Sequence, residues 1–226
     1  MISFKGRHFK DVIILMSVRW YLAYPLSYRH IEELMAERGV DIDHSTINRW
    51  VIKYAPLLER AFTKRYKAQV GGSWRMDETY IKVKGMWNYL YRAVDKCGAT
   101  IDFMLSKKRD HKAARSFFIK AIGYSGRPQK VTIDKSGSNN AALRSLNKRL
   151  KEKDKIEIRQ VKYLNNIAEQ DHRFIKKITR PTLGFKSYSS ANATLLGIEL
   201  HHMLHKGQHI NSNHTPVFEQ FYSLAA

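Results

Sequence analysis

The sequence predicts a protein of mixed α and β structure, in which three N-terminal helices precede a mixed β-sheet with helices packed on its faces. Two observations predict this arrangement. Apolar residues recur at helical spacing before residue 64, whereas alternating, aromatic-rich segments begin after residue 73. Further along the chain, short apolar segments alternate with helical patterns. We therefore expect a helical domain over residues 1–66, a sheet-containing domain over 67–210 and a tail over 211–226.

Three helices joined by short turns are expected in the first domain. The first helix covers residues 9–22. Ser27 can cap the second helix by accepting backbone N–H bonds, and Gly39 can end it. Asp43 or Ser45 can cap the third helix. A helix, a glycine-containing turn and a second helix form the helix-turn-helix pattern.

The third helix separates apolar from polar side chains. Its inner stripe consists of Ile47, Trp50, Val51 and Tyr54. The side chains that lie away from this stripe are of the types that contact base edges and phosphates, namely Ser45, Thr46, Asn48, Arg49 and Lys53. These five residues are candidate DNA contacts. The alternative is a plain three-helix bundle with a solvated polar face.

The second domain is expected to begin with three antiparallel strands and to continue with strands and helices in alternation. Strands are expected over residues 74–83, 87–94, 100–106, 130–134 and 156–161, and helices over 112–122, 140–151, 166–179 and 191–206. A Lys84-Gly85 turn joins the first two strands. Three antiparallel strands followed by this alternation predict a mixed sheet covered by helices.

The charge balance points to a polyanionic partner. The chain carries 40 Lys and Arg against 20 Asp and Glu, a net charge of +20, and phosphates favour such an excess because binding releases their condensed counterions. The single cysteine, Cys97, excludes an internal disulfide and a multi-cysteine zinc site. No apolar run approaches the roughly 20 residues that cross a bilayer. We therefore expect a nucleic-acid partner, no membrane, and a reducing, cytoplasmic setting.

Three carboxylates are candidates for a shared site. Asp77 lies within the first strand, Asp134 lies where the fourth strand ends, and Glu169 lies on a later helix. If the first and fourth strands are neighbours and the helix packs beside them, the three side chains converge. Converging anions repel one another, and divalent cations resolve this repulsion. Carboxylate oxygens are the hard ligands that Mg²⁺ prefers, so the pattern predicts a divalent metal site.

The helix expected over residues 166–179 supports this site. One apolar stripe contains Ile167, Phe174, Ile175 and Ile178. Glu169 and Lys176 project together on the opposite side, with Arg173 nearby as a further candidate DNA contact. The alternative is a solvated face with an ordinary ion pair. Asp171 falls on the apolar side, where it could pair with a buried base or cap a neighbouring segment.

Two other patterns are weaker. His201 and His205 are spaced like zinc ligands, but the His-Glu-x-x-His arrangement is missing, so we interpret them as helix-end cations or phosphate contacts. Glu78 follows Asp77 on a strand, where successive side chains point to opposite faces. Glu78 is therefore not expected to bind the same metal as Asp77.

Five ordered segments carry a resemblance to a known family. They read LSYRHIEELMAERGV, HSTINRWVIKYAP, WRMDETYIKVKGMWNYLYRAVD, VTIDKSGSN and YLNNIAEQDHRFIK, and 34 residues separate Asp134 from Glu169. The chain resembles small bacterial insertion-sequence transposases with an Asp-Asp-Glu catalytic core, in the group that moves by cointegrate formation (insertion sequence family six). The segments span most of residues 10–180, in the family's order and with the family's spacing.

The resemblance implies an RNase H-like, retroviral integrase-like core in which Asp77, Asp134 and Glu169 are the catalytic metal ligands and Lys176 is the family's basic residue seven positions later. It implies Mg²⁺ or Mn²⁺, as two ions, and a reaction that frees a 3′-OH at the transposon end and joins it to target DNA. The helix-turn-helix would bind the terminal inverted repeats, and a homodimer or larger oligomer would pair two ends at the bacterial nucleoid. Two alternatives are a sequence-specific DNA-binding repressor without catalysis and an RNase H-like nuclease that cuts without joining.

Overall fold

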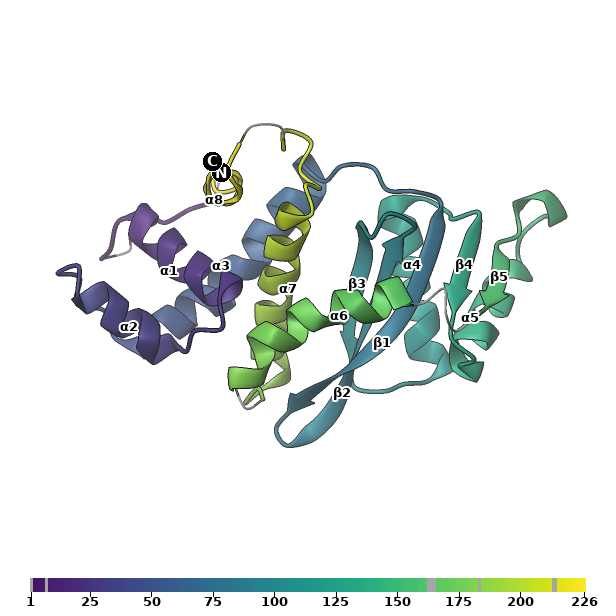
Figure 1. Cartoon of the computed structure of the whole chain (residues 1–226), viewed down its shortest axis with the longest axis horizontal. Helices are drawn as coiled ribbons and strands as arrows, with labels where there is room; N and C mark the ends of the chain where they lie inside the picture. Colours follow the sequence, from purple (N-terminus) through teal and green to yellow (C-terminus); the bar gives the residue numbers. More distant parts are fainter. Residues whose placement is uncertain (1, 7, 162–165, 183, 213–214) are drawn as a thin grey trace. The chain divides into compact units, whose positions relative to one another are not determined.

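The computed structural model describes the chain except for residues 1, 7, 162–165, 183 and 213–214 (Figure 1). The helices are α1 (Asp11–Ala23), α2 (Tyr28–Ala36), α3 (His44–Arg65), α4 (His111–Ser125), α5 (Gly137–Asn147), α6 (Asn166–Thr179), α7 (Tyr188–His205) and α8 (Val217–Ser223). The strands are β1 (Ser73–Val83), β2 (Met86–Asp95), β3 (Thr100–Ser106), β4 (Lys130–Ile133) and β5 (Glu157–Gln160). Short 3-10 turns cover Glu152–Asp154 and Arg180–Thr182.

The chain packs into two compact units. One unit comprises Met1–Ala68 together with Phe174–Ala226, and the other comprises Gln69–Arg173. The division falls inside α6. In the first unit, α7 packs against α3 and α1, and α8 packs against α7 and α1. The last two helices therefore belong to the same unit as the three N-terminal helices.

Capping fixes the starts of α2 and α3 as the sequence predicts. The Ser27 hydroxyl accepts a hydrogen bond from the His30 backbone N–H at 3.1 Å, and the Asp43 carboxylate accepts one from the Ser45 backbone N–H at 2.8 Å. Gly39 adopts a positive φ of 70° in the turn that follows α2, a conformation that costs glycine little. The predicted inner stripe of α3 is buried, including Ile47 and Tyr54.

The second unit is built on a five-stranded mixed sheet in the order β3-β2-β1-β4-β5. β1 pairs antiparallel with β2 through the predicted Lys84-Gly85 turn, where both residues have positive φ, as a two-residue hairpin of the primed type requires. β1 pairs in parallel with β4, and β4 in parallel with β5. The predicted adjacency of the first and fourth strands is confirmed, and with it the predicted mixed sheet.

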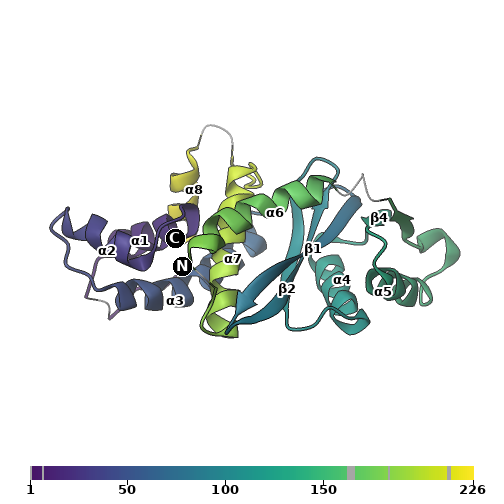
Figure 2. The same ribbon diagram turned by 60° about the horizontal axis from the view of Figure 1, so that its bottom comes forward.

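Helices cover both faces of this sheet. α4 and α5 lie on one face, and the first part of α6 lies on the other, over β1 and β2 (Figure 2). The core between the sheet and the pair α4 and α5 is apolar, with Trp74, Met76, Phe117 and Leu143 fully or almost fully buried. This core packs the central strands of the sheet against α4 and α5.

Several boundaries differ from the sequence-based expectation. α5 covers Gly137–Asn147, three to four residues earlier than expected, because it begins almost directly after β4. The segment expected to be a tail contains α8, whose Phe221 is fully buried. Among the described residues, no helix has the combination of length and apolar character that crossing a bilayer requires.

Candidate active site

Asp77 and Asp134 are brought together by the parallel pairing of β1 with β4. Arg75 lies opposite Thr132 in this pair, so two residues further along each strand Asp77 comes beside Asp134. β4 ends at Ile133, which leaves Asp134 at a strand end in the loop that leads to α5. The Ser136 backbone N–H donates to Asp134 Oδ1 at 2.9 Å and fixes that side chain. The predicted convergence of these two carboxylates is therefore present.

Glu78 joins this group, contrary to the expectation from strand alternation. One carboxylate oxygen from each of Asp77, Glu78 and Asp134 lies within 4.8 Å of the others. Alternation does direct Asp77 towards α6 and Glu78 towards α4 and α5. The two side chains nevertheless approach each other on the β4 side of β1, because β4 has ended at this level and no strand lies between the two faces there. Strand alternation thus did not predict how near Glu78 lies to Asp77 and Asp134, while the expectation that it does not bind the same metal stays a prediction.

Two side chains hold Glu78. Asn139 of α5 donates a hydrogen bond to its Oε1 at 3.0 Å, and Arg109 Nη2 lies 3.5 Å from its Oε2. Burial raises the pKa of the Glu78 carboxyl, and Arg109 and Asn139 oppose this effect without cancelling it. Partial burial disfavours the charged form of Arg109, but nearby negative charges, Glu78 first among them, outweigh it and raise its pKa.

Asp77 is held from the opposite face by His172 of α6. The His172 Nε2–H donates to Asp77 Oδ2, with 3.1 Å between the two atoms, because an ionised carboxylate can only accept. The His172 ring is buried, and its Nδ1 has no hydrogen-bond partner among the described residues. His172 therefore orients Asp77, as the hydrogen-bond partners of metal ligands commonly do.

Asp171 makes the neighbouring contact between α6 and the sheet. Its Oδ2 lies 2.7 Å from Arg92 Nη2, and the two side chains are 10% and 1% exposed. The sequence-based suggestion that Asp171 pairs with a buried base is confirmed. Ile167, however, is 37% exposed, although it was expected in the apolar stripe. The buried face of α6 includes Ala168, His172 and Ile175 and is rotated away from Ile167.

Glu169, Arg173 and Lys176 are all exposed on α6, as expected from their positions on the helix. Glu169 lies three residues before His172, about one helical turn from the residue that touches Asp77. Among the described residues, the group of converging carboxylates consists of Asp77, Glu78 and Asp134, and Glu169 is not one of its members. The structure thus brings together two of the three predicted carboxylates.

The donor set fits a divalent cation. Carboxylate oxygens within 4.8 Å of one another are hard ligands, and their mutual repulsion requires a positive charge. Asp77 and Asp134 would hold such an ion, since each has oxygens that point to the shared space. Arg109 supplies a positive charge beside Asp134, at 3.6 Å from its Oδ2.

Comparison with known proteins decides the family. Residues 71–208 match the family described as DDE domain, and this range contains Asp77, Asp134 and Glu169. The chain is 44% identical over 203 residues to the transposase for insertion sequence-like element IS431mec of Staphylococcus aureus strain Mu50, covering 90% of this chain and 88% of the relative. The chain belongs to the DDE-domain transposases of insertion sequences. It is therefore a DDE transposase, a polynucleotidyl transferase.

Two further similarities accompany this match. The transposase for insertion sequence element IS257 in transposon Tn4003 of Staphylococcus aureus is also 44% identical, over the same shares of the two chains. The HTLV-2 integrase catalytic core domain, solved in complex with magnesium in a trimeric form, is 18% identical with a TM-score of 0.40 and covers 58% of this chain and 86% of that one.

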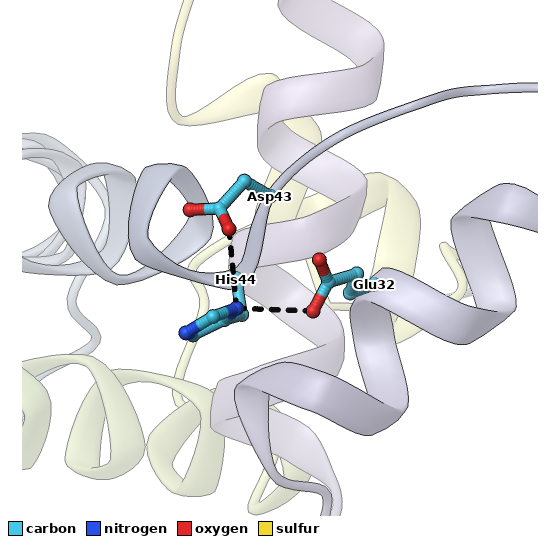
Figure 3. A group of neighbouring side chains, drawn as sticks. All are labelled: Glu32, Asp43 and His44. Carbon is cyan, nitrogen blue, oxygen red and sulfur yellow. Dashed lines mark hydrogen bonds and ion pairs between the residues drawn. The ribbon is translucent and has the colours of Figure 1, made fainter.

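The start of α3 in this transposase is fixed by a small charged group. His44 Nδ1 lies 3.1 Å from Glu32 Oε2 of α2 and 3.2 Å from Asp43 Oδ2, so the imidazole joins α2 to the cap of α3 (Figure 3). The hydroxyl of Ser45 donates to Asp43, and Arg49 donates to the Thr46 hydroxyl at 2.7 Å. The candidate DNA contacts are thus arranged by local hydrogen bonds at the beginning of the helix.

All five candidate contacts on α3 lie outside the buried stripe. Ser45, Arg49 and Lys53 are exposed, and Thr46 and Asn48 are half-buried. Their distribution matches the predicted polar face of the helix.

His201 of the transposase differs from its sequence-based interpretation. It is 2% exposed, and burial lowers its pKa to about 3, with smaller contributions from His205, Arg19 and His202. His201 is therefore neutral at physiological pH and cannot serve as a helix-end cation. Its helical spacing from His205 indicates packing, since the two rings lie edge to face at 4.8 Å.

Sequence reasoning missed Arg109 and His172. His172 could have been noticed, because a polar residue among buried positions of an amphipathic helix needs a partner. Arg109 carried a weaker signal, since it follows two lysines in a loop and resembles an ordinary solvated basic run.

Proposed function

We propose that this transposase binds the terminal inverted repeats of an insertion sequence, cleaves a strand at each end to free a 3′-OH, and transfers that hydroxyl to a phosphodiester of target DNA. The observation that supports the proposal most strongly is the approach of Asp77 and Asp134 on neighbouring parallel strands, in a chain of the DDE family. The net charge of +20 favours a DNA substrate.

The catalytic roles are assigned to four residues. Asp77, Asp134 and Glu169 hold Mg²⁺ or Mn²⁺, as two ions, and Lys176 contacts a DNA phosphate. When bound, the ions supply Lewis acidity and lower the pKa of the attacking oxygen. His172 keeps Asp77 in one orientation through its Nε2–H, and the Ser136 backbone N–H does the same for Asp134. Glu169 completes the set from α6.

Recognition of the ends is assigned to the domain over residues 1–66. Bases and phosphates are contacted by five residues of α3, namely Ser45, Thr46, Asn48, Arg49 and Lys53. Arg173, which belongs to the catalytic domain over 67–210, contacts the DNA backbone. A homodimer or larger oligomer brings two ends together. The enzyme acts on double-stranded DNA at the nucleoid in the bacterial cytoplasm, where its substrate lies.

A joining assay tests the proposal. Purified full-length chain is mixed with labelled element ends, target plasmid and Mn²⁺, and the wild type is compared with Asp134→Asn. The expected result is nicking at the ends and labelled plasmid with the wild type alone. End binding without nicking would identify a repressor instead, and nicking without transfer to the plasmid would identify a nuclease.

A further inference from the structure

Glu78 carries a negative charge that the proposed catalytic set does not use. Its side chain is 3% exposed, directly beside two other carboxylates. Burying a charged carboxylate costs several kcal/mol unless hydrogen bonds and an opposite charge compensate for it. Asn139 and Arg109 provide this compensation on different oxygens of Glu78. The buried Glu78 carboxylate therefore holds the Arg109 side chain in place.

The backbone at Arg109 is fixed by the helix that follows. Asp110 caps α4 by accepting a hydrogen bond from the Ala113 backbone N–H at 2.8 Å. From this position the Arg109 side chain reaches across to β1, and the same Nη2 atom lies 3.5 Å from Glu78 and 3.6 Å from Asp134. A long side chain from a helix start is thus directed into the space beside a proposed metal ligand.

Arg109 remains open to a substrate. Its side chain is 35% exposed, and its ion pairs with the described carboxylates use only one terminal nitrogen, Nη2. A guanidinium is planar and presents several N–H donors, which match two oxygens of a phosphate group better than an ammonium does. The buried partner, Glu78, keeps the group in place, and the exposed part faces solvent at the level of Asp134.

We propose that Arg109 binds the DNA phosphate at the reacting bond and that Glu78 is the anchor of Arg109 and not a metal ligand. The inference rests on the proposed strand-transfer function and adds a catalytic cation on the α4 side of the site, separate from Lys176 on α6. Asp134 would then hold a metal ion while its Oδ2 lies 3.6 Å from the Arg109 guanidinium.

The variants Arg109→Gln and Glu78→Gln test both parts, with Lys108→Gln as a matched control. Lys108 is the exposed neighbour of Arg109, so its loss removes the same charge from the same loop. Joining by Arg109→Gln should fall about a hundredfold or more, as when a donor to a developing oxyanion is removed. Joining by Lys108→Gln should stay near wild type. Arg109→Lys should recover only part of the lost joining, because an ammonium cannot present the paired, coplanar N–H donors of a guanidinium.

Mn²⁺ binding to the full-length chain without DNA, measured by electron paramagnetic resonance, supplies a second readout. Arg109→Gln and Glu78→Gln should bind Mn²⁺ at least as well as the wild type, whereas Asp77→Asn should bind it more weakly. Glu78→Gln should also lower joining, since Arg109 loses its anchor. Loss of Mn²⁺ binding in Glu78→Gln, matching Asp77→Asn, would make Glu78 a ligand and overturn the anchor.

The outcomes separate this inference from the proposed function. If the wild type joins ends and Arg109→Gln joins them equally well, the proposed role of Arg109 is wrong but the strand-transfer function stands. The same conclusion follows if Lys108→Gln loses as much joining as Arg109→Gln. A wild-type chain that binds ends and Mn²⁺ but never joins defeats the strand-transfer function and the inference with it. Thermal unfolding of each variant shows whether a loss of joining reflects misfolding. If Glu78→Gln lowers the melting temperature, the double variant Glu78→Gln and Arg109→Gln should restore the melting temperature but not joining.

Discussion

Asp77 and Arg92 lie directly opposite each other on the antiparallel strands β1 and β2, and each holds one of two consecutive residues of α6. Asp77 accepts from His172 at 3.1 Å, and Arg92 pairs with Asp171 at 2.7 Å. Opposite residues of a strand pair point to the same face, so the two contacts form a polar clamp that fixes the first part of α6 on the sheet. Glu169 lies on the same turns of α6, and its position therefore depends on this clamp.

The hydrogen bond from His172 to Asp77 should matter for metal binding. His172→Phe keeps the bulk of the ring but leaves Asp77 without its donor, and we expect Mn²⁺ affinity or joining to fall by about 10- to 100-fold, as for other partners of metal ligands. His172→Gln can place an amide N–H near the Nε2 position and should recover most of the loss. Mn²⁺ titration without DNA, together with joining, measures both effects. Equal behaviour of the Phe and Gln variants would show that only packing matters at this position.

The pair of Arg92 and Asp171 should matter for stability. Arg92→Met removes the cation that pairs with the largely buried Asp171, and we expect the free energy of unfolding to fall by about 3–5 kcal/mol. The double variant Arg92→Met and Asp171→Leu removes both charges and should lose much less. Urea unfolding at pH 7 measures both values. A double variant as unstable as the single one would show that the cost comes from packing and not from loss of the ion pair.

Glu169→Gln tests the third carboxylate. We expect joining to be lost while binding of labelled ends stays near wild type, because the change removes a metal ligand and leaves the DNA contacts intact. The exposed Glu152, changed to Gln, serves as the control for loss of one negative charge. Wild-type joining by Glu169→Gln would show that the assignment of Glu169 is wrong. Loss of end binding in the same variant would place its role in recognition instead.

Local patterns predicted much of the fold. The strand over residues 100–106 and the helix over 166–179 were predicted to the residue, because alternation and helical spacing act over a few neighbouring positions. α8 was missed because a seven-residue helix offers too short a pattern. The packing of α7 and α8 in the unit of α1–α3 depends on contacts between distant segments, which no local pattern records.

The candidate site was predictable only in part, for the same reason. The adjacency of Asp77 and Asp134 followed from two strands being neighbours. The approach of Glu78 to the other carboxylates depended on the residue at which β4 ends, and sequence patterns do not fix the end of a strand to a single residue. The contacts of His172 and Asp171 depended on which strands α6 crosses, so Ile167 was assigned to the buried face in error.

Arg49 should contribute to recognition of the element ends. It is exposed near the start of α3, and Arg49→Ala should weaken binding of end DNA and lower the dependence of binding on salt, since each phosphate contact releases counterions. Joining of ends supplied at saturating concentration should persist. Arg60→Ala removes the same charge from the exposed surface of the same helix and is the matched control. Equal weakening by both variants would indicate general attraction and not recognition by the start of α3.

His201 should make the stability of the first unit depend on pH. Burial lowers its pKa in the folded chain to about 3, whereas the unfolded chain has the ordinary value near 6.5. Between pH 3 and pH 6.5 the His201 ring is protonated in the unfolded chain and neutral in the folded chain. The contribution of His201 to the free energy of unfolding is therefore complete above about pH 6.5 and decreases as the pH falls towards 3. At pH 5 the loss from this residue should be about 2 kcal/mol. His201→Leu should remove this part of the pH dependence, as measured by urea unfolding at pH 7.5 and pH 5. His8 is exposed, and His8→Gln should leave the wild-type dependence in place. An equally steep loss of stability in His201→Leu would show that other groups cause it.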